Sequence, residues 1–172
     1  MTVAILYPTY PTATALTITI AGLASDANLL TGRQSAVIDN TGATAYDDYL
    51  ISGKITANGV TAPTTAKSIE VWAVGSGDGT AWPDTITGAG DAGKAWTSAD
   101  IKAANVAFIA AMATSATVGQ GYPFRPVSLK AAFGGVLPPK ALIFVTHSMV
   151  QATHATGANS FITVQPVAAN IN

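Results

Sequence analysis

The sequence of 172 residues lacks cysteine and has few charged side chains. Without cysteine, neither a disulfide bond nor a thiolate metal site can stabilise the fold, so its stability must come from packed apolar surface. Only 10% of the residues are Asp, Glu, Lys or Arg, against about 25% in an average globular domain. The net charge of -1 provides no positive field that would attract nucleic acid, so we expect no nucleic-acid partner.

Long hydrophobic runs are also missing, although 49% of the residues are hydrophobic. The longest apolar stretch, Val106 to Ala113, is much shorter than the roughly 20 residues that span a bilayer. Met1 to Ile5 show no basic segment leading into an apolar run, so we expect no secretory signal. The sequence therefore predicts no membrane partner, and a surface that is covered by small polar residues or buried against other subunits.

Short alternating patterns predict a mainly β fold. Residues with a spacing of two are apolar in several segments, which is typical of half-buried strands. A continuous apolar run instead indicates a strand covered on both faces. The alternating strands are expected at Leu16 to Ile20, Asp48 to Thr56, Lys67 to Val74 and Ser160 to Val167, and the covered strand at Lys140 to His147. Gly53 is expected at a bulge or at a close approach of two backbones.

Two short helices are expected between the later strands. Thr97 to Asp100 resembles a capping box and predicts a helix over 98–104, followed by a strand over 106–114. A second helix is expected over Val127 to Phe133, after a break at Pro123 to Pro126. Residues 75–95 are rich in glycine and form a long loop on a functional or packed surface.

Seven or eight strands with long connections predict one β-sandwich domain of jelly-roll type. The sandwich is expected to occupy residues 14–172. Residues 1–13 are expected to form an extended N-terminal arm that reaches a neighbouring subunit, because Pro8 and Pro11 favour extended backbone. The alternative is a frayed terminus.

Groups that carry catalysis are scarce, so we expect no enzyme, no cofactor and no metal centre. His147 and His154 are the two histidines, and their spacing fits no common zinc motif. The segment GSGDGT lacks the lysine and hydroxyl residue that end a phosphate-binding loop. A Ca²⁺ ion held by loop aspartates is a minor alternative, with Asp78, Asp84 and Asp91 as its ligands.

Aromatic side chains are the candidate contact residues. Large rings anchor protein interfaces, fill cores, or serve as platforms on which sugars stack. Trp82 stands beside Pro83 in the glycine-rich loop and is the ring most expected to be exposed. The candidate interaction residues are Tyr7, Tyr10, Trp82, Trp96, Tyr122 and Phe124.

Four stretches resemble virion proteins of tailed bacteriophages. They are DDYLISGKITANG, SIEVWAVGSGDGTAWPD, YPFRPVSLKAAFGGVLPPKALIFVTHS and TGANSFITVQPV, and together they cover most of residues 47–167. The resemblance is to capsid decoration (cement) proteins with jelly-roll or related sandwich folds. It implies a subunit on the capsid surface of the virion, assembled in the cytoplasm of the bacterial host.

This resemblance implies two protein partners. The first is the major capsid protein of the same phage, and the second is the chain itself, as a homotrimer, because symmetric assembly uses one surface patch repeatedly. Low charge lowers the desolvation cost of burying a broad surface. The alternative function is a carbohydrate-binding sandwich in a phage tail or host-attachment structure, with Trp72 and Trp82 exposed on one sheet face.

Overall fold

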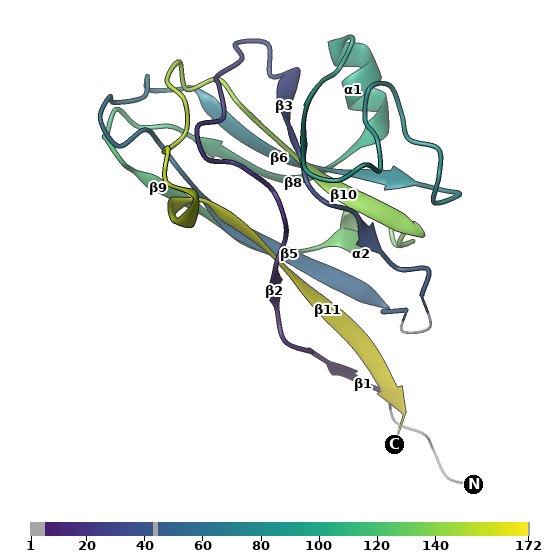
Figure 1. Cartoon of the computed structure of the whole chain (residues 1–172). Helices are drawn as coiled ribbons and strands as arrows, with labels where there is room; N and C mark the ends of the chain where they lie inside the picture. Colours follow the sequence, from purple (N-terminus) through teal and green to yellow (C-terminus); the bar gives the residue numbers. More distant parts are fainter. Residues whose placement is uncertain (1–5, 43–44, 172) are drawn as a thin grey trace, which may run out of the picture.

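Two antiparallel sheets pack face to face as a sandwich, which confirms the predicted fold class (Figure 1). The computed structural model describes residues 6–42 and 45–171. The first sheet has the order β1-β11-β5-β9, with β2 also paired to β11. Its strands are β1 (Leu6–Thr9), β2 (Thr14–Ala15), β5 (Asp48–Thr56), β9 (Gly121–Ser128) and β11 (Phe161–Ile171).

The second sheet has the order β7-β3-β10-β6-β8, with β4 also paired to β10. Its strands are β3 (Thr31–Gln34), β4 (Ile38–Asp39), β6 (Ser68–Ser76), β7 (Ala92–Ala95), β8 (Val106–Ala113) and β10 (Lys140–His147). The connections β5–β6, β8–β9, β9–β10 and β10–β11 all cross from one sheet to the other. Such crossings join the two sheets into a single sandwich.

The main core lies between the two sheets. Alternate residues of β5 and β6, including Ile51, Ile55, Ile69 and Val71, are fully buried there. This burial follows the period of two in the sequence, because successive side chains of a strand point to opposite faces.

A second apolar cluster covers the other face of β10. Leu142 and Phe144 pack there against Ile86 and Trp96, which belong to the long connection after β6 and to the segment before α1. Both faces of β10 are therefore buried, which explains its continuous apolar run. The long loop predicted at 75–95 is shorter than expected, because β6 continues to Ser76 and Ala92–Ala95 form β7. Ile86, in the remaining loop, belongs to this cluster.

Helix α1 (Ala99–Asn105) leads into β8, and helix α2 (Leu129–Ala132) follows β9. Ser98 caps α1 by accepting a hydrogen bond from the amide of Ile101, and Ser128 caps α2 in the same way from Ala131. A short 3₁₀ turn at Gly157–Asn159 precedes β11. The first helix agrees with its predicted range within a residue, whereas the second is shorter than predicted.

Gly53 lies both at a bulge and at a close approach of two backbones, the two features predicted for it. The register between β5 and β9 shifts between Ile51 and Gly53. A Cβ atom on Gly53 would lie 2.4 Å from the carbonyl oxygen of Phe161 in β11. Because β11 passes so close, this position has room for glycine alone.

Two further sequence predictions are wrong. The segment Leu16 to Ile20 is not a strand, because the chain crosses between the sheets there. The amide of Leu16 bonds to Ile162 in the first sheet, and the carbonyl of Thr17 accepts from Ala36 beside the second. The expected break at residues 123–126 is strand β9, whose two prolines are tolerated because β9 is an edge strand.

Candidate interaction surfaces

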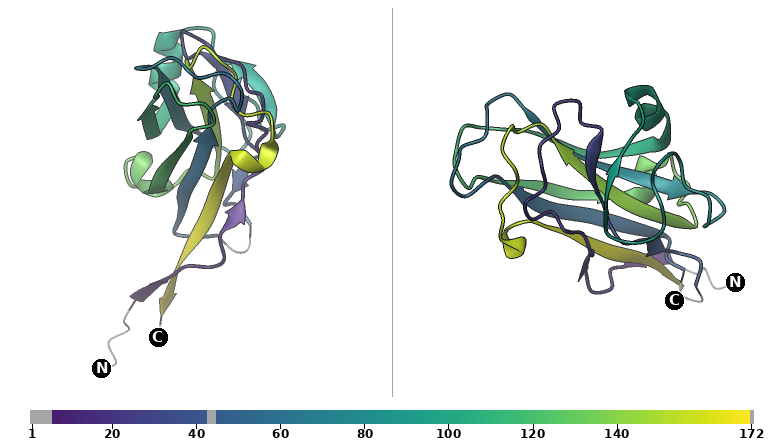
Figure 2. Two further views of the ribbon diagram at one scale, coloured as in Figure 1. Left: turned by 90° about the vertical axis from the view of Figure 1, so that its left-hand side faces the viewer. Right: turned by 45° about the horizontal axis from the view of Figure 1, so that its top comes forward.

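The last part of β11 extends beyond the sheet that it belongs to. β5 pairs with Phe161 to Val167, whereas Ala168 to Ile171 pair with β1. Residues 6–9 and 168–171 therefore form a two-stranded ribbon, called here the terminal projection. The left view of Figure 2 shows this ribbon standing away from the body of the sandwich.

The terminal projection and the segment after it carry exposed aromatic rings. Tyr7 is 50% exposed and Tyr10 is 57% exposed. Residues 1–25 and 141–172 contain no Asp, Glu, Lys or Arg. An uncharged surface with exposed tyrosines is suited to protein contact, because tyrosine anchors interfaces and no charge has to be desolvated.

Trp96 and Tyr122 pack inside the subunit. Trp96 is 3% exposed and meets Phe144 edge to face, with ring centroids 6.0 Å apart. The hydroxyl of Tyr122 accepts a hydrogen bond of 3.0 Å from the amide of Ser115. Both rings stabilise the fold and offer little surface to a partner in the folded subunit.

Trp82 and Phe124 are half-buried and lie far apart: Trp82 is in the connection between β6 and β7, beside the second sheet, and Phe124 is in the first sheet. Trp82 packs against the second apolar cluster, and its ring lies so close to Gly88 that a Cβ there would be 2.8 Å from Nε1. Phe124 lies on β9 at the edge of the first sheet. The structure thus brings Tyr7 and Tyr10 into one region but does not unite all six predicted residues in one surface.

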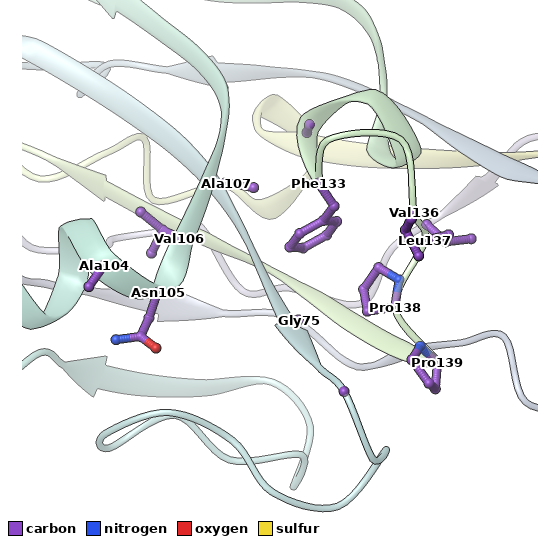
Figure 3. A pocket seen from close by; sticks show the side chains of 12 residues that line it. Gly75, Ala104, Asn105, Val106, Ala107, Phe133, Val136, Leu137, Pro138 and Pro139 are labelled. Carbon is purple, nitrogen blue, oxygen red and sulfur yellow. The ribbon is translucent and has the colours of Figure 1, made fainter.

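An open groove of about 690 Å³ lies at one end of the sandwich. Figure 3 shows Phe133 on one side of it, Val106 and Asn105 on the other, and Pro138 along its rim. Most of its lining is apolar, and Val136 is 74% exposed at the border. A shallow apolar groove is suited to contact and provides no set of convergent polar groups for chemistry.

A buried ion pair fixes α1 to the outer face of the second sheet. The ammonium of Lys102 lies 3.0 Å from the carboxylate of Glu70 and donates to the carbonyl of Leu29 at 2.8 Å. Trp72 donates its indole N–H to Glu70 at 2.8 Å, and the ammonium lies 5.0 Å from its ring centroid. Trp72 therefore takes part in an internal network and is not a free platform.

The two histidines have separate structural roles. His147 is fully buried, and its Nε2 donates to the carbonyl of Leu23 at 2.9 Å. Burial lowers the pKa of His147, because desolvation disfavours its charged form. Nδ1 of His154 accepts the amide of Thr156 at 3.0 Å. These contacts fit the interpretation of both residues as polar groups at the ends of strands or in loops.

The three loop aspartates that are candidate calcium ligands each have different partners. Asp78 accepts the amides of Thr80 and Ala81, and these bonds lower the pKa of Asp78 to about 2. Asp84 accepts the amide of Thr97, while Asp91 pairs with Arg33. Across residues 6–42 and 45–171, no group of three His, Cys, Asp or Glu side chains is placed to hold a metal ion.

No protein-family model, curated protein or solved structure matches the chain. In the part of the chain that the structure describes, no helix is both long enough and apolar enough to cross a membrane.

Sequence reasoning did not identify the terminal projection or the Lys102–Glu70 pair. The projection forms because β11 extends beyond the end of β5. No local sequence pattern indicates this difference in strand length. One feature of the sequence does indicate the ion pair. Glu70 is the single glutamate of the chain and stands within an apolar strand, and a charge in such a place is usually paired.

Proposed function

We propose that this chain is a structural subunit of a tailed-bacteriophage particle, which binds the outer surface of the capsid and stabilises the shell by non-covalent contacts. The terminal projection supports this proposal most. It presents an uncharged ribbon with exposed Tyr7, and Tyr10 follows directly after it. A ribbon that stands away from a rigid body can lie on a neighbouring protein, such as the major capsid protein.

In this proposal the sandwich and the terminal projection have different roles. The two packed sheets provide a rigid body, and the projection and the uncharged surface provide contacts. A subunit that binds only the assembled shell stabilises that shell by mass action. We also propose that the subunits associate with one another, with a trimer as the arrangement that the resemblance to decoration proteins favours.

Binding to capsids tests the proposal directly. Shells of the major capsid protein of the same phage, lacking this chain, are mixed with purified subunits and separated by sedimentation. We expect saturable binding that Tyr7→Ser with Tyr10→Ser weakens at least about tenfold, since losing two interface anchors typically costs more than 1.4 kcal/mol. Phe161→Ser is the control, because Phe161 is 45% exposed at the opposite end of β11. No binding by the unaltered chain would contradict the proposal.

A second candidate function, carbohydrate binding in a tail or attachment structure, is favoured by one hollow. It has a volume of about 470 Å³ and is lined by Trp82, Asp39 and Lys140, among others. The carboxylate of Asp39 lies 3.5 Å from the ammonium of Lys140. An aromatic ring beside polar groups is suited to a sugar, which offers an apolar face and hydroxyls. Saturable polysaccharide binding that is lost in Trp82→Ala would support this candidate over the first.

A further inference from the structure

The edges of the two sheets differ in how well they are protected against pairing with another strand. Natural sheets protect their edges with proline, charge or very short strands. β9 carries two prolines and Arg125, β7 has four residues with Lys94, and β1 has four residues with Pro8. β8 has eight residues, VAFIAAMA, with neither proline nor charge, although a bulge at Ile109 interrupts its pairing with β6.

The free edge of β8 borders two hollows. Among the described strands β8 pairs with β6 alone. Its first two residues line the 690 Å³ groove, and Phe108 to Met112 line a second hollow of about 430 Å³ that separates β8 from β9. Phe108 is 54% exposed. An added strand would therefore find open backbone groups and space for its side chains.

The sequence of β8 is complementary to itself when it is paired antiparallel about its midpoint. In that register each of the four larger side chains lies opposite an alanine. The opposed pairs are Val106 with Ala113, Ala107 with Met112, Phe108 with Ala111, and Ile109 with Ala110.

The two faces of the strand agree with this register. Because the bulge at Ile109 adds one residue to β8, Phe108 and Ala111 both lie on the outer face of the sheet, beside Trp72 and Glu70 of β6. Met112 lies beside the buried Ile69, on the inner face. Directly opposed residues of an antiparallel pair share a face, and the register joins outer residues to outer ones and inner residues to inner ones.

We propose that β8 pairs with β8 of a second copy of this chain, antiparallel about a two-fold axis between Ile109 and Ala110. The pairing joins the second sheets of two subunits into one continuous sheet. The absence of charge favours an identical strand as the partner, because no like charges meet across the axis. Such an isologous contact gives a dimer, whereas a trimer requires a different surface.

Sedimentation of the purified chain over a range of concentrations tests this contact. We expect a dimer, and we expect Ala111→Lys to raise its dissociation constant about tenfold or more. The two-fold axis repeats each cross-strand pair, so this one substitution disrupts two pairs. The new lysine lies beside Glu70 of its own subunit, so the fold tolerates it. The matched control is Ala95→Lys on β7, an exposed alanine at the opposite edge of the same sheet.

Disulfide cross-linking tests the register, because the chain has no cysteine of its own. A mixture of Phe108→Cys and Ala111→Cys should cross-link, since opposed Cβ atoms are about 5 Å apart. Each variant alone should not, because identical positions are three residues out of register, or about 10 Å apart. Phe108→Cys mixed with Ala113→Cys is the control, shifted by two residues. Equal cross-linking in all mixtures would overturn the register.

The outcomes separate this contact from the proposed function. A monomer at all concentrations, or an oligomer that Ala111→Lys leaves intact, overturns the β8 contact. A dimer sensitive to Ala111→Lys supports the contact, even if the chain fails to bind capsids and the proposed function is lost.

Discussion

Removal of residues 1–13 should leave the sandwich folded and nearly as stable as the full chain. In the described part of this segment no residue belongs to either core cluster. Its attachments in the described part of the chain include the pairing of β1 with β11, a 3.4 Å bond from Thr9 to Ala168, and a 3.4 Å bond from Gln165 to Pro11. Both side-chain bonds are only partly buried, so water can replace them when the segment is removed.

The expected magnitude follows from two opposing terms. A hydrogen bond contributes about 0.5–1.5 kcal/mol net, while ordering the backbone costs about 1–2 kcal/mol for each residue. For a ribbon with about one bond per ordered residue these terms nearly cancel. We therefore expect the truncation to change the free energy of unfolding by less than about 1 kcal/mol.

Urea unfolding followed by circular dichroism and tryptophan fluorescence measures the change. The matched comparison is Ile20→Ala, seven residues beyond the cut, because Ile20 is 1% exposed in the main core. Ile20→Ala should lower the free energy of unfolding by about 2–5 kcal/mol. A loss above about 2 kcal/mol on removing residues 1–13, or loss of the native near-ultraviolet spectrum, would show that the segment is an integral part of the sandwich and refute this reasoning.

Three further predictions concern the body of the sandwich. Lys102→Met leaves the carboxylate of Glu70 without its cation, so we expect the free energy of unfolding in urea to fall by about 2–3 kcal/mol. This is less than the full loss for a buried pair, because 18% of the Glu70 side chain is exposed. Gly53→Ala places a Cβ against Phe161 and should cost about 1–3 kcal/mol by the same assay. The folded pKa of Asp78 lies below its unfolded value, so its stabilisation is present above about pH 4 and lost as the pH falls toward 2. Asp78→Asn should therefore lose less stability between pH 5 and pH 2 than the unaltered chain.

Strands with a strong local pattern could be predicted from the sequence. β5 and β10 have the predicted bounds, because alternation and continuous burial each leave a distinct spacing of apolar residues. The sequence does not predict β9, because its two prolines indicate an interruption between strands. A strand can contain them here because β9 lies at the edge of its sheet. Leu16 to Ile20 alternate like a strand, yet tertiary contacts divide this segment between the two sheets.

The candidate surface could be predicted only in part. Tyr7 and Tyr10 are exposed, and the sequence around them lacks the alternation of a core strand. The burial of Trp96 follows from packing on β10, which lies far away in the sequence. The free edge of β8 depends on strand order, which local patterns do not encode.

The heat resistance of phage shells tests the central claim most directly. Particles assembled with and without this chain are heated in parallel, and shell opening is followed by release of the packaged DNA. The proposed function predicts that shells lacking the chain open at a lower temperature and that added purified subunits restore the higher one. Subunits without residues 1–13 should restore less, although they are folded. Equal opening temperatures for both kinds of shell would contradict the claim.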